Sequence, residues 1–257
     1  MTREHVLQEA AHRTVVRVGD TVRRPVQPWT PAVHALLRHL QDVGFTRAPR
    51  VRGVDGRGRE VLEYLPGESG PAGWAKVVPD AGLTAFARLL RDYHQAVREF
   101  RPPPGLLWCT GAGTADEDEP VCHGDFGPWN VVWNGGEPTG LLDFDYARPA
   151  PPLHDVAYAL EYAAPFRPDT ECVRWLGYAG PPDRRRRLEL FADAYGLTDT
   201  TGLVDAVIAV QLTTRDLVRS LAAQGHQPQA DQVRAGLLDA LARRAAWSRA
   251  HRHLFTR

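Results

Sequence analysis

Lysine, cysteine and long apolar runs are scarce in this chain of 257 residues. Lys76 is the single lysine among 31 basic residues, so almost all positive charge is carried by arginine. The three cysteines, at positions 109, 122 and 172, are too few and too widely spaced for a disulfide framework or a zinc knuckle. No apolar run reaches the roughly 18 residues of a membrane-spanning helix, and the polar first residues do not resemble a secretory signal. We therefore expect a cytoplasmic protein that does not enter membranes.

An excess of either charge is also missing, because 31 basic residues balance 31 acidic residues. A chain without net charge has no general attraction for nucleic acid or for anionic membranes, and we expect it to bind neither. With 43% hydrophobic and 24% charged residues, it is too apolar to be disordered. Its length corresponds to one or two domains at roughly 150 residues each.

Strand signals dominate the first 65 residues. A run rich in Val, Thr and Arg with the turn signal Gly19-Asp20 predicts a hairpin, and an apolar stripe with Thr30 as N-cap and Pro31 at N1 predicts a helix. The expected elements are a hairpin over 13–26, a helix over 31–43 and strands over 50–54 and 60–65.

Helical patterns dominate the rest of the chain, after the Pro66-Gly67 break. The expected helices cover 81–100, 154–164, 184–195, 203–224 and 229–252. We therefore predict an α+β fold with a small β-rich lobe over 1–66 and a larger, mainly helical lobe over 67–257. A cleft between two such lobes is a common place for a ligand.

One stretch carries side chains suited to chemistry. Segments 131–133 and 141–144 flank a Gly-rich turn and predict a second hairpin. A turn centred between Gly136 and Glu137 would place Asn130 opposite Asp143, with Cβ atoms about 5 Å apart. Two oxygen-bearing side chains at that separation could share Mg²⁺. Asp125, five residues before Asn130, could place a carboxylate beside the metal.

These three residues match the requirements of phosphoryl transfer. Asp125 would accept the proton of an attacking hydroxyl, while cations neutralise the charge of the transferring phosphate. The spacing His123-x-Asp125-x-x-x-x-Asn130 is the catalytic-loop pattern of protein kinases, with glycine in place of their arginine. Taken singly, His123 could be a packed histidine and Asp125 a turn residue. Asn130 and Asp143 could merely cap the ends of the hairpin. Asp145 could add a metal contact or lie on a solvated strand end.

The run His123-Gly-Asp125-x-x-x-x-Asn130, followed by Leu-Leu-Asp143-Phe-Asp145 and His154-Asp155-Val-Ala, resembles the aminoglycoside phosphotransferase family of kinase-like enzymes. The resemblance implies a bilobal protein-kinase-like fold and a monomer or weak dimer. It implies ATP or GTP with Mg²⁺ as cofactors, Asp125 as the base, Asn130 and Asp143 as magnesium ligands, and Asp155 as a brace of the catalytic loop. The sequence Asp-Phe-Asp-Tyr-Ala at 143–147 also resembles that of choline and ethanolamine kinases. The implied acceptor is a hydroxyl of an aminoglycoside-like or amino-alcohol molecule, and antibiotic resistance would be one role.

The first lobe departs from the family pattern. Arg23 is the expected basic residue of the phosphate-binding strand, with Arg24 pointing to the opposite face. The usual helix glutamate is replaced by Val33 or His34, and 8–13 contains no glycine for a phosphate loop. The nucleotide base is expected, from order in the chain alone, at Glu63, Tyr64 and Leu65.

Two further readings of the function stay open. The missing glutamate and glycine loop favour a degenerate kinase-like protein that binds nucleotide or confers immunity with little turnover. A hydrolase using Cys122 beside His123 is disfavoured, because neighbouring residues on a strand point to opposite faces.

The acceptor is not defined by the charges of the helical region. From residue 161 onward there are 11 acidic residues and 14 arginines, a formal charge of +3, so nothing demands a polycationic acceptor. The acidic run at 116–119 could line the cleft or be a solvated loop.

Overall fold

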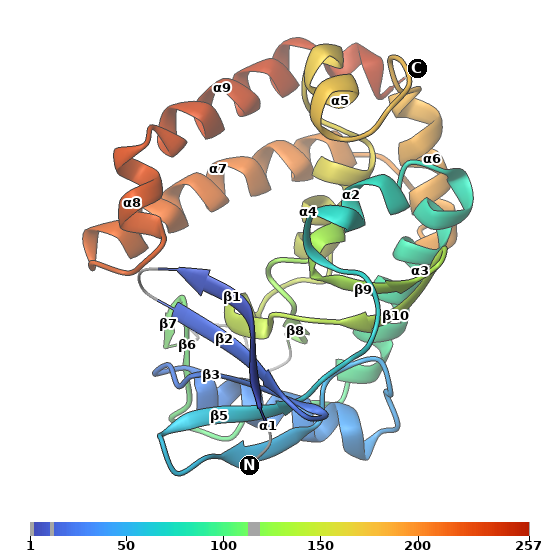
Figure 1. Ribbon diagram of the computed structural model, residues 1–257. Coiled ribbons are helices and arrows are strands. Elements are labelled where there is room, and N and C mark those ends of the chain that lie inside the picture. Colours follow the sequence, from blue (N-terminus) through green and yellow to red (C-terminus); the bar gives the residue numbers. More distant parts are fainter. Residues whose placement is uncertain (1–2, 11–12, 113–118, 257) are drawn as a thin grey trace.

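The computed structural model describes residues 3–10, 13–112 and 119–256. Most of the acidic run at 116–119 therefore lies outside the described residues. No helix among the described residues is both long enough and apolar enough to cross a membrane. The sheet of the first part and the helices of the second confirm the predicted α+β fold (Figure 1).

Five antiparallel strands form the N-terminal sheet in the order β1-β2-β3-β5-β4. The predicted hairpin and the two later strands are confirmed, with β3 lying between β2 and β5. The first strand was not predicted, because all but the last of its side chains are exposed and it therefore shows no apolar alternation. The strands are β1 Glu4–Ala10, β2 Arg13–Val18, β3 Thr21–Pro25, β4 Val51–Val54 and β5 Arg59–Glu63.

Helix α1, Thr30–Asp42, buries the predicted apolar stripe, including Leu36, Leu37 and Leu40. It starts one residue earlier than predicted, with Trp29 at the cap position, and the Thr30 hydroxyl instead accepts a hydrogen bond from the Gln27 N–H. The sheet and this helix all precede residue 66, and the lobe boundary there stays a prediction.

The remaining chain folds into helices with short strands at their base (Figure 1). The helices are α2 Gly73–Lys76, α3 Asp80–Val97, α4 Leu153–Ala163, α5 Asp169–Trp175, α6 Arg184–Tyr195, α7 Leu203–Ala223, α8 Gln229–Arg234 and α9 Leu237–Ala250. The strands are β6 Leu107–Trp108, β7 Gly111–Ala112, β8 Val121–Cys122, β9 Val131–Asn134, β10 Glu137–Leu141 and β11 Arg148–Pro149. Single 3-10 turns cover Gly70–Ala72, Pro128–Asn130, Phe144–Tyr146 and Arg252–Leu254.

The last predicted helix, over 229–252, is in fact two helices. Gly236 has φ +89, a left-handed conformation that glycine adopts at little cost, and it ends α8 before α9 begins. The short helix α5 was missed.

The core supports the loop that follows β8. Helix α3 contributes Phe86, Leu90 and Tyr93, which have no exposed surface, and Phe86 lies 4.8 Å from Phe126, ring centre to ring centre. The Tyr93 hydroxyl donates to the carbonyl of Val121 at the start of β8. The loop that follows β8 is thus anchored on a well-packed helix at the junction between the sheet and the helices.

Candidate active site

Asp155, in the first turn of α4, braces the loop that follows β8. Its carboxylate accepts the backbone N–H of His123 at 2.6 Å and of Gly124 at 2.9 Å, and it contacts Nε2 of His94 at 3.2 Å. Burial alone would raise the pKa of Asp155, but the hydrogen bond and charge of His94 leave that pKa well below its usual value. A fully buried carboxylate with these partners holds two successive loop amides in one arrangement.

Gly124 and His123 define the path of this loop. Gly124 has φ +79, and a Cβ there would lie 2.0 Å from the carbonyl oxygen of Tyr146, so no other residue fits. Nε2 of His123 contacts the Leu142 carbonyl at 2.9 Å, and its Nδ1 accepts the N–H of Asp125 at 3.3 Å. Burial lowers the pKa of His123, and a neutral ring supplies the one donor and one acceptor that these contacts require. His123 is therefore a structural residue.

Asp125 presents its carboxylate to a cavity between the lobes. The Tyr158 hydroxyl donates to its Oδ1 at 2.5 Å, and Nδ2 of Asn130 donates to its Oδ2 at 2.8 Å. Burial raises the pKa of Asp125 to about 7, although the hydrogen bonds from Tyr158 and Asn130 oppose the shift. A carboxylate with such a pKa can take up a proton near neutral pH.

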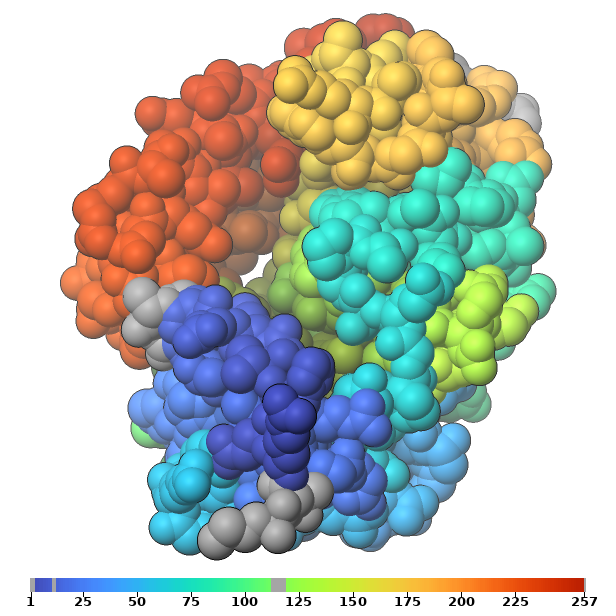
Figure 2. Space-filling view, viewed as in Figure 1, coloured from blue at the N-terminus to red at the C-terminus, as the bar shows by residue number. Residues whose placement is uncertain are grey.

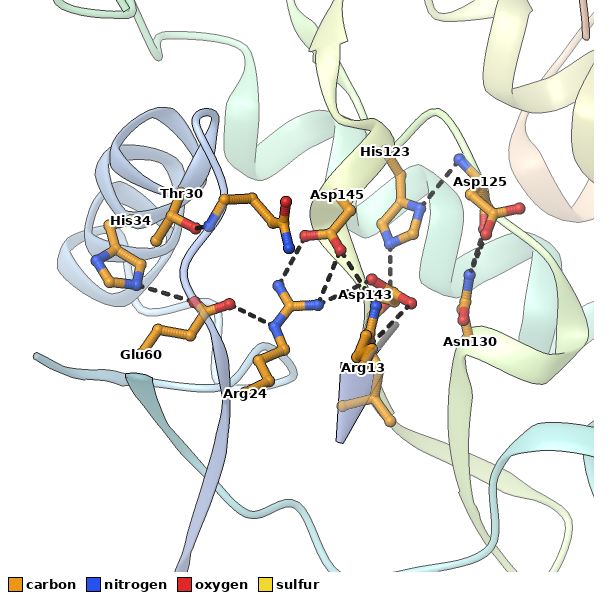
Figure 3. A network of polar contacts seen from close by, with 12 residues as sticks. Arg13, Arg24, Thr30, His34, Glu60, His123, Asp125, Asn130, Asp143 and Asp145 are labelled. Atoms are coloured by element: carbon orange, nitrogen blue, oxygen red, sulfur yellow. Dashed lines mark hydrogen bonds and ion pairs between the residues drawn. The ribbon is translucent and has the colours of Figure 1, made fainter. Parts of the chain in front are cut away.

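Two further carboxylates, Asp143 and Asp145, line the same cavity and are bound by two arginines (Figure 3). Arg24 donates to Asp143 Oδ1 at 3.1 Å and to Asp145 Oδ1 at 2.8 Å, and Arg13 lies 3.4 Å from Asp145 and 3.7 Å from Asp143. Burial raises the pKa of Asp145, as does the neighbouring charge of Asp143. For Asp143 the charges of Arg24 and Arg13 outweigh burial and lower the pKa.

The predicted register of the second hairpin was wrong. The turn is Gly135-Gly136, so Glu137 pairs with Asn134, and an irregularity before Gly140 shifts the ladder by one residue. The N–H of Leu142 then donates to the Asn130 carbonyl at 2.7 Å, which leaves Asp143 one residue beyond the partner of Asn130.

Asp143 has also left the strand conformation, with φ +59 and ψ +69. Its side chain lines the cavity, whereas Asn130 is buried behind Asp125 and does not line it. The two residues therefore share a corner of the site without facing each other across a ladder (Figure 3).

The predicted orientation of the two strand β3 arginines was also wrong. Arg23 pairs with Asp55 at 3.3 Å, away from the carboxylates of the cavity, and Arg24 faces them. The reason lies in the cross-strand partner, because Arg24 is directly opposite Glu60 on β5 and the two side chains are hydrogen bonded. Burial lowers the pKa of Arg24, but the charges of Asp145, Asp143 and Glu60 dominate and raise it.

Glu60, on β5, is the acid that contacts Arg24. It is 1% exposed, and its second oxygen contacts Nε2 of His34 on α1 at 3.0 Å. The acid thus comes from a neighbouring strand, and the helix contributes a histidine that holds it. Sequence reasoning missed Glu60, although an acidic residue just before the apolar pair 61–62 was a visible anomaly.

The segment expected to hold the nucleotide base lies at the end of β5, outside the lining of this cavity. The N–H of Glu63 donates to the Arg50 carbonyl at 2.9 Å, and the N–H of Tyr64 donates to the Asp20 carbonyl at 2.8 Å. The guanidinium of Arg17 lies 3.8 Å above the Tyr64 ring. The role of Glu63, Tyr64 and Leu65 in binding a nucleotide stays a prediction.

The cavity has a volume of about 620 Å³. One wall comes from the N-terminal part of the chain, including Gln8 and Trp29, and the opposite wall comes from α7, α8 and the connection between them. Figure 2 shows the molecule hollowed between the blue N-terminal strands and the orange-to-red helices. The rings of Trp29 and His226 meet at 5.8 Å across this gap.

The donor atoms at the acidic end suit a hard cation. Asp143 and Asp145 offer carboxylate oxygens to the cavity, and Asn130, buried beside Asp125, carries an amide oxygen. These are the ligand types that Mg²⁺ prefers. A second cluster, formed by His94, Cys122 and Asp155, is fully enclosed, and its carboxylate already holds the loop amides. The first set is therefore the candidate metal site.

Comparisons with known proteins identify the family of the chain. Residues 106–191, which contain the loop and the second hairpin, match the model of the phosphotransferase enzyme family. The trifolitoxin immunity protein of Rhizobium leguminosarum bv. trifolii is 34% identical over 215 residues, which cover 81% of this chain and 80% of the relative.

Two solved structures share the fold. An amicoumacin kinase in complex with AMP-PNP, Ca²⁺ and Ami superposes with a TM-score of 0.63 at 14% identity, covering 96% of this chain and 88% of the other. The GDP complex of wild-type aminoglycoside 2'-phosphotransferase-IIIa gives a TM-score of 0.63 at 18% identity, covering 95% and 92%. The predicted bilobal kinase-like fold is confirmed by these likenesses.

Proposed function

Because the chain belongs to the phosphotransferase enzyme family, we propose that it is a kinase that transfers the γ-phosphoryl group of ATP or GTP to a small-molecule hydroxyl. The observation that supports this most strongly is the setting of Asp125. Its carboxylate lines the cavity, is held by Tyr158 and Asn130, and stands on a loop braced by Asp155.

Asp125 is the proposed base. The acceptor oxygen attacks the γ-phosphorus, the bond between that phosphorus and the bridging oxygen of the nucleotide breaks, and the hydroxyl proton passes to Asp125. A pKa of about 7 leaves a large fraction of Asp125 deprotonated at neutral pH and still able to hold the proton it receives. Tyr158 and Asn130 keep the carboxylate in one orientation.

Asn130 and Asp143 are the proposed magnesium ligands, and Asp145 is a further oxygen donor at the same corner. When bound there, the metal would supply positive charge that neutralises the nucleotide phosphates. In the structure described here, Arg24 and Arg13 occupy the oxygens of Asp143 and Asp145. The arginines must therefore release part of these contacts when nucleotide and metal enter.

Arg24 is the proposed phosphate-binding residue, because its guanidinium is buried beside the carboxylates of the cavity. Glu60 and His34 hold it there from β5 and α1. While Glu60 keeps the Arg24 side chain in place, its guanidinium can exchange the contacts with the two carboxylates for contacts with phosphate oxygens. Phosphate and carboxylate oxygens present similar acceptor geometry. Glu63, Tyr64 and Leu65 are proposed to hold the nucleotide base.

The test separates nucleotide binding from transfer. Calorimetry with ATP and Mg²⁺ should give the same affinity for the wild type and for Asp125→Asn, which keeps the shape of the side chain. Consumption of ATP with an acceptor panel should fall by about 10²–10⁴-fold in the variant, because the proton has no acceptor. Asp199→Asn, an exposed acid on the α6–α7 connection, is the matched control and should behave as wild type. Undiminished consumption by Asp125→Asn would contradict the proposal.

A second function is a nucleotide- or ligand-binding protein of the immunity type with little turnover. It is supported by the relative that is named an immunity protein and by the arginines that occupy Asp143 and Asp145. Such a protein would bind nucleotide or ligand but show little consumption of ATP with any acceptor, in the wild type and in Asp125→Asn alike.

A further inference from the structure

The helical wall of the cavity differs from its acidic end. Between residues 214 and 232 the lining side chains are aliphatic groups, a threonine, a histidine and the three glutamines Gln227, Gln229 and Gln232. Within the described part of the chain, this wall supplies no carboxylate to the cavity. An acceptor held against it meets amides and apolar surface.

The acids of this segment are engaged by neighbouring side chains. Asp216 is exposed and pairs with Arg219 at 2.8 Å, whereas Asp231 is exposed, pairs with Arg234 and accepts a hydrogen bond from the Gln227 amide at 3.0 Å. Neither lines the cavity. Among the described residues, the carboxylates that do line it are Asp125, Asp143 and Asp145 at the other end, and two of these are already neutralised by arginines.

Glutamines also stand on the opposite wall. Gln8 from β1 and Gln27 from the turn before α1 line the cavity there. A primary amide offers both donors and an acceptor, so two facing walls of amides suit a ligand that carries amide groups of its own. Among them, Gln229 is buried and donates to the Tyr146 hydroxyl, which anchors it in place.

Aromatic side chains line the same cavity as Asp125. Trp29, Trp129 and Tyr158 line the cavity, and the Tyr158 hydroxyl is the group that holds Asp125. These faces can pack against apolar or planar parts of an acceptor while its hydroxyl approaches Asp125. A polycation would instead lose water around several ammonium groups and, among the described residues, gain carboxylate partners only at the acidic end of the cavity, which is unfavourable for the groups held against the helical wall.

Resting on the kinase function proposed above, we propose that the acceptor is an uncharged, amide-rich molecule of peptide-like chemistry that carries a hydroxyl, and that it binds between the two glutamine walls. The volume of about 620 Å³ lies within the roughly 300–1,000 Å³ of small-molecule sites, so a short peptide fits. The hydroxyl oxygen forms the new bond to phosphorus, and its proton goes to Asp125.

The first experiment compares two kinds of probe on the full chain. Tetrapeptides blocked by N-acetyl and C-amide groups, each with one serine or threonine among glutamine, asparagine and aliphatic residues, are the uncharged probes, and kanamycin is the polycation. We expect saturable calorimetric binding and phosphorylation of at least one peptide, with neither for kanamycin. Tighter binding or phosphorylation of kanamycin, or failure of every peptide to bind, would overturn the proposal.

A charge graft makes the comparison sharper. The double variant Thr214→Glu/Gln232→Glu places two carboxylates on the helical wall and should bind kanamycin about tenfold more tightly than the wild type, since one tenfold step corresponds to a few weak ion pairs. The control Thr213→Glu/Gln224→Glu adds the same charge at exposed positions outside the lining and should leave kanamycin affinity unchanged. An equal gain in the control would contradict a role for this wall.

Failure of the acceptor class and failure of the kinase function give different results. Phosphorylation of kanamycin overturns the acceptor class and leaves the kinase intact. Binding of ATP and Mg²⁺ is measured on the same samples without any acceptor. Its absence would overturn the proposed kinase function, whereas the calorimetric binding of the peptides would still test the proposed acceptor class.

Discussion

The loop that follows β8 and the arginine cluster of the N-terminal sheet serve one site but are built in different ways. The side chains that mark the loop are close in sequence, with Asp125 bonded to Asn130 five positions later, although Asp155 braces the loop from α4. The cluster joins residues from β3, β5 and α1, namely Arg24, Glu60 and His34. The first can be recognised as a motif, whereas the second depends on strand register and becomes visible only in the folded chain.

The largest expected effect is the loss of the brace under the loop. Asp155→Ala leaves the amides of His123 and Gly124 buried without an acceptor, and it should lower the free energy of unfolding by about 3–5 kcal/mol. Urea unfolding followed by circular dichroism measures this change. Asp216→Ala, an exposed acid on α7, is the control, and an equal loss there would contradict the role given to Asp155.

The comparison of the two arginines of β3 is the next test. Arg24→Gln removes the charge that is bonded to Asp143 and Asp145 and should weaken ATP binding by about 10–100-fold, the range expected for a hydrogen bond to a charged group. Arg23→Gln, one residue away on the same strand, should change it little, because Arg23 pairs with Asp55. Calorimetry with ATP and Mg²⁺ decides between them, and equal losses would mean that the register of β3 does not select the phosphate contact.

A smaller effect is expected when Arg24 is kept but its support is changed. Glu60→Gln retains a hydrogen-bonding group beside Arg24 and His34 and removes the negative charge. The KM for ATP should rise about tenfold while kcat changes less, because a positioning residue acts through the arginine. A fall in kcat at constant KM would assign Glu60 to the chemical step instead.

The smallest expected change is in the pH profile. The transfer rate should rise with pH as Asp125 loses its proton, with a midpoint near its pKa of about 7. The Tyr158 hydroxyl lowers this pKa, so Tyr158→Phe should move the midpoint to higher pH. Rates measured from pH 5.5 to 9 test both statements, and a midpoint that moves to lower pH in the variant would contradict them.

Sequence reasoning succeeded where the determining contacts are local. The hairpin of β2 and β3 and helix α1 follow from turn residues and apolar periodicity. The spacing of His123, Asp125 and Asn130 pointed to the loop that follows β8, whose catalytic role stays a prediction. The register between β9 and β10 could not be predicted, because the Gly135-Gly136 turn competed with alternatives one or two residues away and a later irregularity shifted the ladder again. The choice of Arg24 over Arg23 depends on Glu60 across the ladder, which the order of residues does not reveal.

The acceptor wall could be seen only in part. The charge count beyond residue 161 indicated that no polycation is required, but it did not show which side chains face the cavity. The bend at Gly236 separates α8 from α9 and allows the short segment with Gln229 and Gln232 to lie over the cleft. The sequence pattern suggested one continuous helix over 229–252, and from such a helix this wall could not be predicted.

The most direct measurement follows the γ-phosphoryl group itself. ATP labelled in the γ-phosphate, with Mg²⁺ and the blocked peptide panel, is incubated with the wild type and with Asp125→Asn, and the label on the acceptor hydroxyl is quantified by mass spectrometry. The account predicts labelled product with the wild type, at a level reduced by about 10²–10⁴-fold in the variant. Equal labelling by both proteins would contradict the central claim that Asp125 receives the proton of the acceptor.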